Sequence, residues 1–319
     1  MTACRLMLRR RPTYLRVVVT GRCPLACRYC HAEGDRMPME LKLRPAGLPC
    51  ADLAGLFRVA ARAGVRKVKL LGGEPLVRGD LPDVVRALRA AMPAGDLSLI
   101  TSGAADADRL QAAFDAGLDR ANLTIHGWSE AAFARRGGNG RLHARRGRIL
   151  DTLLAGGRKL KVNYVYSGRH DDADLAGLLE YAAGRPMVVN VLDNLDDPTG
   201  GLAKVQAALQ RVHGQWDRAE IDLDADSMDA AILHWDDGLK VEIKTRRLGD
   251  MAPWSHCETC PVRSRCGEGI FAVRTVSDGS LRLCMDRPDL TLPLADIVRR
   301  DGVEAGAAAW DRFMTEALQ

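Results

Sequence analysis

Short apolar runs alternate with longer amphipathic stretches along the first two-thirds of the chain. Runs rich in Val, Leu and Ile are typical of buried strands, whereas apolar residues spaced three and four apart are typical of helices. Several amphipathic stretches open with Asp, which is favoured at a helix N-terminus. The pattern predicts helices near residues 50–63, 80–92, 106–117, 145–156 and 171–183, and strands near 15–20, 66–71, 97–101, 120–125, 161–166 and 187–192.

Repeated strand–helix units of this kind build a parallel sheet, so the predicted fold class is α/β. Six strands fit a partial (β/α)6, TIM-like barrel, although the strand count alone does not separate a barrel from a doubly wound sheet. In both architectures ligands bind at the C-terminal ends of the strands. We expect Cys23, Gly72, Thr101, Thr124 and Asn163 to lie at these ends.

The chain changes character between residues 193 and 203, where Asp, Asn, Pro and Gly gather. Such residues mark a loop, so we predict a barrel domain over residues 1–200 and a smaller, Cys-rich C-terminal domain over 201–319. In the second part the sequence predicts a helix near 203–213, mixed structure over 228–245, a hairpin that turns at Asp278-Gly279, and terminal helices over 290–317.

Composition and charge narrow the range of partners. A chain of 319 residues with 47% hydrophobic and 27% charged residues is typical of a globular protein with a large core. A net charge of +5 is compatible with an anionic substrate or with a simple excess of Arg, and it indicates no nucleic-acid partner. No apolar run approaches the roughly 18 residues that span a bilayer, and no signal sequence follows the basic start of the chain. We therefore expect a cytoplasmic protein without a membrane partner.

Nine cysteines in a cytoplasmic chain point to metal ligation, because thiols stay reduced there. Cys23, Cys27 and Cys30 follow the first predicted strand at spacings of four and three. Three thiolates can hold three corners of a 4Fe-4S cluster and leave one iron open. Zinc, with His31 as a fourth ligand, is the alternative at this point.

A second group contains Cys257, Cys260, Cys266 and Cys284. From composition alone, four cysteines favour a closed zinc site slightly over an iron–sulfur cluster. The two remaining cysteines, Cys4 and Cys50, fit no ligand spacing.

Around the first cysteine group the sequence resembles the radical S-adenosylmethionine (SAM) enzymes. The resemblance rests on the three-cysteine spacing, on the aromatic Tyr29 before the last cysteine, and on Gly72-Gly73-Glu74-Pro75. It implies a 4Fe-4S cluster whose open iron binds SAM and, with an electron from a donor such as flavodoxin or ferredoxin, cleaves it to a 5'-deoxyadenosyl radical. It also makes an auxiliary 4Fe-4S cluster the expected occupant of the second cysteine group.

Within that superfamily the chain resembles the molybdenum cofactor biosynthesis protein A, or GTP cyclase, branch. The likeness extends through Tyr14–Cys23, Val68–Leu81, Ala116–His126, Lys161–Asn163 and the turn that leads to Cys284. By motif position it implies SAM contacts from Tyr29, Gly72, Gly73, Glu74, Thr101, Ser102, Thr124 and Asn190, the last of which replaces a family arginine. It implies contacts to an anionic substrate from Arg16, Lys67, Lys69, Lys161 and Arg274, at the same mouth of the barrel that receives SAM.

Three departures argue against GTP cyclisation itself. Of the family's C-terminal arginine pair only Arg274 remains, with Ala272 in the other place. Cys266 is an additional cysteine that could close the auxiliary cluster. The chain also ends in Glu316-Ala-Leu-Gln319 instead of the family's paired glycines.

We therefore expect a radical SAM enzyme, a lyase or oxidoreductase. It would abstract hydrogen from a small anionic substrate in cofactor or natural-product biosynthesis, and nucleotide derivatives are one class of such substrates. A maturase of ribosomally made peptides and a non-catalytic iron–sulfur or zinc protein are the alternatives. No catalytic acid or base is assigned, and His126 is open to interpretation as a local proton donor or as a polar loop residue.

Overall fold

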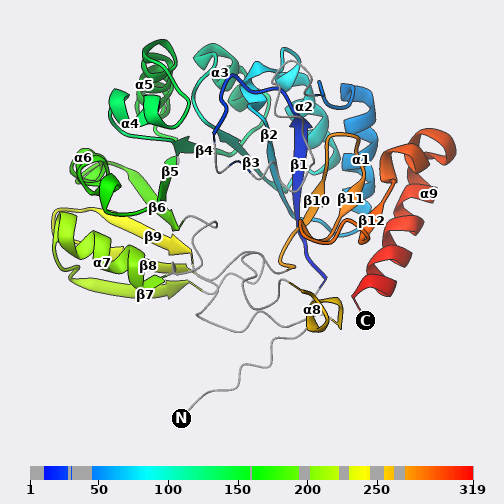
Figure 1. Ribbon diagram of the computed structural model, residues 1–319. Helices are drawn as coiled ribbons and strands as arrows, with labels where there is room; N and C mark the ends of the chain where they lie inside the picture. The colour runs from blue at the N-terminus through cyan, green and yellow to red at the C-terminus, as the bar shows by residue number, and fades with distance from the viewer. Residues whose placement is uncertain are drawn as a thin grey trace.

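The computed structural model describes residues 11–27, 30, 45–158, 160–193, 202–222, 230–244, 255–261 and 270–318. Within these residues the strands form one curved sheet in the order β12-β11-β10-β1-β2-β3-β4-β5-β6-β9-β8-β7. Helices cover the convex side of this sheet (Figure 1). The arrangement confirms the α/β class and the partial barrel.

Six neighbouring parallel strands form the centre of the sheet. The ends of each strand lie within one residue of the prediction, because apolar runs of this length leave little choice of boundary. These strands are β1 (Tyr14–Thr20), β2 (Lys67–Gly72), β3 (Asp96–Thr101), β4 (Arg120–Ile125), β5 (Leu160–Tyr166) and β6 (Met187–Asp193).

The α-helices between these strands also follow the predicted periodicity, with two differences. A short helix, α4 (Glu130–Arg135), was not predicted. The next helix starts at Gly140 instead of near residue 145, because the Asn139 side chain accepts a hydrogen bond from the Leu142 amide and caps it. The remaining helices are α1 (Cys50–Arg62), η3 (Pro75–Val77), α2 (Leu81–Ala91), α3 (Ala107–Asp115), α5 (Gly140–Ala155), η4 (Arg169–Asp171) and α6 (Asp172–Ala182).

The C-terminal part of the chain extends the same sheet at both edges. Strand β9 (Lys240–Lys244) lies parallel beside β6, and β10 (Val273–Thr275) lies parallel beside β1. The predicted hairpin is confirmed, since β10 pairs antiparallel with β11 (Leu281–Arg282) across the turn at Gly279. The other elements are α7 (Leu202–His213), β7 (Arg218–Asp222), β8 (Ala230–His234), α8 (Ser255–Glu258), β12 (Thr291–Leu292) and α9 (Leu294–Ala317), which is kinked at Gly302.

The two faces of the sheet differ in polarity. In β1, Leu15, Val17 and Val19 are buried in the core beneath the helices, while Arg16 alternates with them and lies on the concave face. Strands β2 and β5 repeat this alternation with Lys69 and Lys161. The concave face is therefore polar and basic. No helix in the described ranges is long and apolar enough to cross a membrane.

Candidate active site inside the barrel

The segment after β2 packs directly against the loop that follows β1. The Gly73 amide donates to the Thr20 carbonyl over 2.7 Å, and the Glu74 amide donates to the Arg22 carbonyl over 2.8 Å. A Cβ on Gly73 would lie 2.2 Å from the Arg22 oxygen, so no larger residue fits. Gly72 adds a φ of 143° and an equally close approach to Thr20. The paired glycines thus hold the first cysteine loop against the end of the sheet.

A buried carboxylate joins the ends of β2 and β3. Glu74 accepts hydrogen bonds from the Thr101 hydroxyl and the Ser102 amide, both 2.7 Å long, and from the Leu76 amide. The Ser102 hydroxyl donates to the same carboxylate. Burial raises the pKa of Glu74, and these hydrogen bonds offset part of that rise. Three residues expected around SAM are therefore brought together at one end of the barrel.

The first cysteine group is the predicted cluster site. Burial, with smaller contributions from the charges of Glu74, Cys27 and Cys30, raises the pKa of the Cys23 thiol to about 12, although a hydrogen bond from the Leu25 amide offsets part of the rise. Such a thiol would give up its proton near pH 7 only to a bound cation, which a 4Fe-4S cluster would supply. No three His, Cys, Asp or Glu side chains converge on a single-ion position in the described ranges, but the irons of a cubic cluster occupy separate corners.

His126 lies against this cysteine loop. Its Nδ1 is 3.7 Å from the Cys27 sulfur, just beyond the end of β4. Burial, with a smaller contribution from the nearby Arg136 and Arg146, lowers the pKa of His126 to about 4. The ring is therefore neutral near pH 7 and carries no second proton to donate.

Basic residues meet on the concave face. Arg16 of β1 pairs in register with Lys69 of β2 on one side and with Arg274 of β10 on the other. The ammonium groups of Lys67 and Lys69 lie 5.2 and 5.8 Å from the centre of the Tyr14 ring. Arg120 and Lys244, which were not predicted, also lie close enough to act on Lys69. We call this set the basic cluster: Arg16, Lys67, Lys69, Arg120, Lys161, Lys244 and Arg274.

The charge of the basic cluster is only partly offset. The pKa of Lys69 is well below its ordinary value because of burial, with Arg16, Arg120, Lys244 and Lys161 adding repulsion. Within the described part of the chain, Lys69 forms no ion pair. Lys161, by contrast, forms an ion pair with Glu242.

Glu242 was another residue that the sequence analysis missed. Its carboxylate also lies 3.4 Å from the Lys244 ammonium. Burial alone would raise the pKa of Glu242, but the two lysines outweigh burial and hold it below its usual range. The alternation Lys240-Val-Glu-Ile-Lys244, typical of a strand with one polar face, was the signal that could have revealed these residues.

A row of polar side chains crosses the sheet beside the basic cluster. Thr124, Asn163, Asn190 and Glu242 are paired in register on β4, β5, β6 and β9. Asn190 donates to the Asn163 oxygen over 2.9 Å, and Asn163 donates to the Thr124 hydroxyl over 3.4 Å. The Asn190 oxygen is buried and has no hydrogen-bond partner among the described residues. Such an acceptor suits a ligand or a bound water.

Two expected positions were wrong. Asn163 lies in the middle of β5 instead of at its end. The basic residues do not lie at the mouth beside Gly72, because Lys67 is the first residue of β2 and Gly72 is the last. Since the central strands are parallel, position along a strand sets height in the barrel, and the basic cluster lies toward the opposite end.

The second cysteine group lies at that opposite end. Arg282 pairs with Arg274, which pairs with Arg16, so Cys284 is level with the start of β1, whereas Cys23 follows its end. Seven residues of strand separate the two levels by about 20 Å. In Figure 1 the helix α8, which contains Cys257, lies below β10, away from the loop after β1.

Two cysteines of this group, Cys260 and Cys284, lie near Arg287. This arginine donates to the His256 carbonyl over 2.9 Å, and the Asp289 carboxylate and then the Cys260 and Cys284 thiols raise its pKa. Both Cys266 and Tyr29 lie outside the described residues.

Comparison with known proteins agrees with this geometry. Residues 17–182 match the radical SAM superfamily. The chain is similar to a GTP 3',8-cyclase of Mycobacterium marinum, with 32% identity over 96% of this chain and 83% of the relative. It is also similar to a probable GTP 3',8-cyclase of Methanocella arvoryzae, with 28% identity over 88% and 83%.

Solved structures agree on the fold. Streptococcus suis SuiB bound to S-adenosylmethionine aligns with a TM-score of 0.62 and 14% identity, covering 92% of this chain and 65% of that one. A second structure, native anSMEcpe with bound AdoMet, aligns with a TM-score of 0.57 and 12% identity over 96% and 84%.

Proposed function

The chain belongs to the radical SAM superfamily, in the branch of the GTP 3',8-cyclases, and we propose that it cleaves SAM reductively and abstracts hydrogen from a small anionic substrate. Cys23, Cys27 and Cys30 would hold the SAM-binding 4Fe-4S cluster, which when bound supplies the electron for SAM cleavage. Gly72, Gly73, Glu74, Thr101 and Ser102 would form the adjoining SAM site. Tyr29, Thr124 and Asn190 are further proposed SAM contacts.

The basic cluster is the observation that carries the substrate assignment. Arg16 and Lys69 lie side by side on neighbouring strands, and Lys69 has no carboxylate among the described residues to offset it. The repulsion between these neighbouring positive charges favours an anionic ligand, because a bound anion would offset it. Arg offers a bidentate fork and Lys a point charge, which together suit a phosphate group. We propose nucleotide derivatives as the substrate class.

The product is proposed to differ from that of GTP cyclisation. Ala272 is completely buried where the branch carries a second arginine, so no cation acts there. We propose that Cys257, Cys260, Cys266 and Cys284 hold an auxiliary 4Fe-4S cluster with four thiolates. Such a cluster would have no open iron for substrate.

The test starts with anaerobic reconstitution with iron and sulfide. We expect roughly eight irons per chain and release of 5'-deoxyadenosine from SAM after dithionite reduction. Cys27→Ala should abolish the release, whereas Cys50→Ala, a half-buried cysteine at the start of α1, should not. Release from Cys27→Ala at the wild-type level would refute the assignment.

The substrate class has a separate test. We expect inorganic tripolyphosphate and GTP to bind, guanosine to bind more weakly, and GTP to give no cyclised product. Equal binding of GTP and guanosine would argue against phosphate recognition and would favour the peptide alternative.

A further inference from the structure

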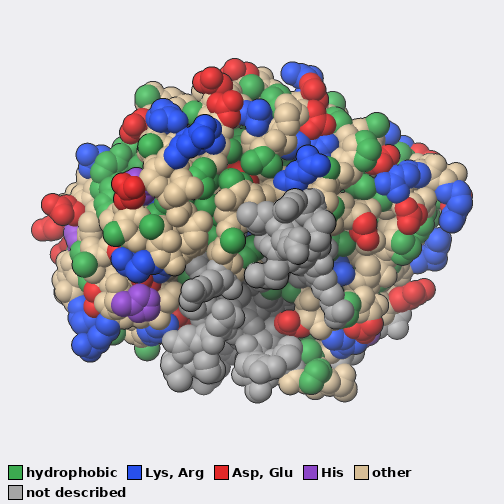
Figure 2. All heavy atoms as spheres, turned by 45° about the horizontal axis from the view of Figure 1, so that its top comes forward, with side chains coloured by type: hydrophobic (Ala, Val, Ile, Leu, Met, Phe, Trp, Pro, Cys, Tyr) green, Lys and Arg blue, Asp and Glu red, His purple; other side chains and the backbone are tan. Residues whose placement is uncertain are grey.

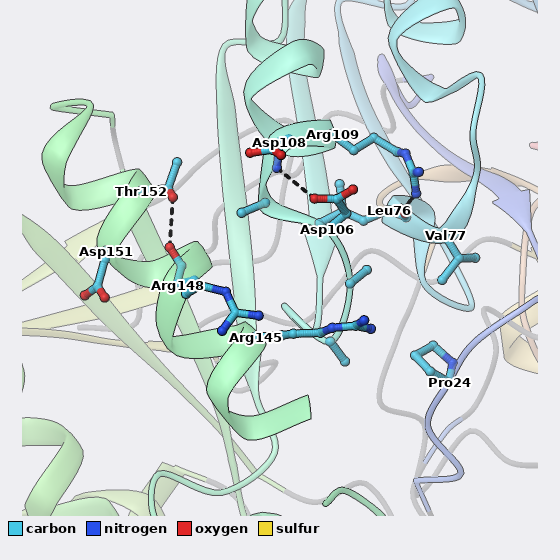
Figure 3. A pocket seen from close by; sticks show the side chains of 13 residues that line it. Pro24, Leu76, Val77, Asp106, Asp108, Arg109, Arg145, Arg148, Asp151 and Thr152 are labelled. Carbon is cyan, nitrogen blue, oxygen red and sulfur yellow. Dashed lines mark hydrogen bonds between the residues drawn. The ribbon is translucent and has the colours of Figure 1, made fainter. Parts of the chain in front are cut away.

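Charges of both signs are mixed on the outside of the molecule. Figure 2 shows basic and acidic side chains interspersed over the face that it presents. A hollow of about 850 Å³ beside Pro24 repeats this balance (Figure 3). Its charged side chains are three arginines and three carboxylates: Arg109, Arg145, Arg148, Asp106, Asp108 and Asp151. An anionic substrate is therefore expected at the basic cluster inside the barrel.

The concave face changes from cations to hydrogen-bond acceptors along β5. Lys161 lies level with Asn122 of β4, whereas Asn163, two residues farther on, lies level with Asn190 and Glu242. Two residues of strand separate these levels by about 7 Å. The Asn163 level is the nearer one to the carboxyl ends of the strands, where the SAM site is proposed. A substrate held by the basic cluster and reaching toward SAM would therefore pass Asn190 and Glu242.

The hydrogen bonds across this level run in one direction. Asn190 donates to Asn163, which donates to Thr124, so the Asn190 oxygen is the acceptor left over. That oxygen is buried, and nothing in the described part of the chain donates to it. A buried acceptor of this kind favours a donor from a ligand or a water. The amide nitrogen keeps a second hydrogen for the proposed SAM contact, whereas the oxygen can only accept.

Glu242 supplies a second acceptor next to this oxygen. It is the neighbour of Asn190 in register on β9, so both side chains lie on the concave face. The Lys161 ammonium donates to Oε2 of Glu242, and the Lys244 ammonium lies 3.4 Å from Oε1. A carboxylate offers about four lone-pair positions, so these two lysines do not saturate it. We call the Asn190 oxygen and the Glu242 carboxylate the acceptor pair.

Charge and distance narrow the donor that fits the acceptor pair. An ammonium group would lie beside Lys161 and Lys244, whose positive charges act on Glu242 and would repel it. Two neighbouring hydroxyl groups are neutral and can each donate one hydrogen bond. The step of about 7 Å between the two levels is comparable to the distance from the phosphate of a sugar phosphate to its ring hydroxyl groups. An amino group on a nucleotide base lies farther from its phosphate.

We propose that Asn190 and Glu242 accept hydrogen bonds from two neighbouring hydroxyl groups of the substrate, and that the substrate is a phosphorylated sugar unit with a free diol. The proposal rests on the proposed function, because it takes the basic cluster as the phosphate site. A phosphate at the level of Lys161 and a diol at the level of Asn190 would place the sugar carbons between the basic cluster and SAM. Nucleotides with an intact ribose belong to this class, and dideoxynucleotides do not.

The experiment compares GTP with dideoxy-GTP, which has the same base and triphosphate but no diol. Calorimetry on the reconstituted full-length chain should show that wild type binds GTP about tenfold more tightly or better, because a site built for hydroxyl groups rejects an analogue without them. Asn190→Leu keeps the volume and removes the acceptor, so most of this preference should be lost. Asn190→Asp keeps an acceptor oxygen and should retain it. Glu242→Gln should reduce it in part, because an amide oxygen accepts more weakly than a carboxylate.

Two controls separate the diol from the anion. Asn122→Leu makes the same change at the level of Lys161, and it should leave the preference for GTP over dideoxy-GTP intact. Inorganic tripolyphosphate has no diol, so it should bind wild type and Asn190→Leu equally. Equal binding of this anion also shows that the Asn190→Leu barrel is folded.

Equal affinity of wild type for GTP and dideoxy-GTP would overturn the diol, and a water would then satisfy the Asn190 oxygen. An unchanged preference in Asn190→Leu, or an equal loss in Asn122→Leu, would overturn the assignment to the acceptor pair. Failure of wild type to bind GTP more tightly than guanosine would instead contradict the proposed function, because no phosphate would be recognised.

Discussion

Lys161 of β5 and Glu242 of β9 form an ion pair across the intervening strand β6, on the concave face of the sheet. The Glu242 side chain is 8% exposed, and that of Lys161 is 30% exposed. The pair joins the predicted barrel to its C-terminal extension and places one carboxylate among many cations.

Replacing Glu242 should expose the repulsion within the basic cluster. We expect Glu242→Gln to lower the free energy of unfolding by about 1–3 kcal/mol, less than for a fully buried pair because Lys161 is partly solvated. Urea unfolding measures the change. Glu220→Gln, an exposed carboxylate that pairs with Arg218 and His234, is the control and should change the stability far less, because solvent screens its ion pairs. Equal losses would contradict the assignment of a special role to Glu242.

The effect of Glu242 should depend on pH. Its pKa is lowered in the folded protein, so its stabilisation is fully present above the pKa of an unfolded Glu, about 4.3, and is lost as pH falls through the lower folded value. The difference in unfolding free energy between wild type and Glu242→Gln should therefore be constant from pH 7 to 5 and shrink in more acidic solution. A difference in unfolding free energy that grows on acidification would contradict a lowered pKa of Glu242 in the folded protein.

Lys69 should contribute directly to anion binding. Lys69→Ala should weaken tripolyphosphate or GTP binding by about 1–3 kcal/mol, the range for a hydrogen bond to a charged group, and leave SAM binding nearly unchanged. Because the pKa of free Lys69 is lowered, the anion should raise it, and binding should take up protons and weaken as pH rises. Calorimetry in buffers of different ionisation enthalpy detects this uptake. Lys240→Ala, at the exposed start of β9, serves as the control.

Removing the second cysteine group should eliminate the proposed auxiliary cluster and leave the SAM-binding cluster in place. Changing Cys257, Cys260, Cys266 and Cys284 to Ala should remove about half of the iron if each cluster holds four. Cleavage of SAM in the absence of substrate should persist, because the first cysteine loop lies at the other end of β1. Metal analysis is the readout, and one zinc per wild-type chain with unchanged iron in the variant would refute the auxiliary cluster.

Gly73 should be essential for the position of the cysteine loop. Gly73→Ala places a methyl group 2.2 Å from a backbone oxygen, and we expect a loss of about 1–3 kcal/mol in stability. The control is Gly147→Ala in α5, where a Cβ meets nothing within 4 Å and should stabilise the helix by up to about 1 kcal/mol. Thermal unfolding compares the two, and a harmless Gly73→Ala would show that the loop moves freely.

The sequence alone determined the local features of the protein. The strand boundaries followed from short apolar runs such as Leu15–Thr20, since a buried parallel strand requires apolar residues on the face beneath the helices. The first cysteine group and the paired glycines were also visible, because cluster ligation and close backbone approach each require particular residue types at short spacing.

Only the tertiary structure decided which distant residues meet. Glu242 lies 81 positions from Lys161, and no local pattern predicts that β9 adds to β6 in parallel, because that pairing depends on where the chain returns. The level of the basic cluster along the barrel axis could not be predicted from the sequence either. A lysine at the start of a strand and a glycine at its end are close in sequence but lie toward opposite ends of the barrel. Arg145 and Arg148 of α5 likewise come beside Pro24 only through the packing of elements more than 100 residues apart.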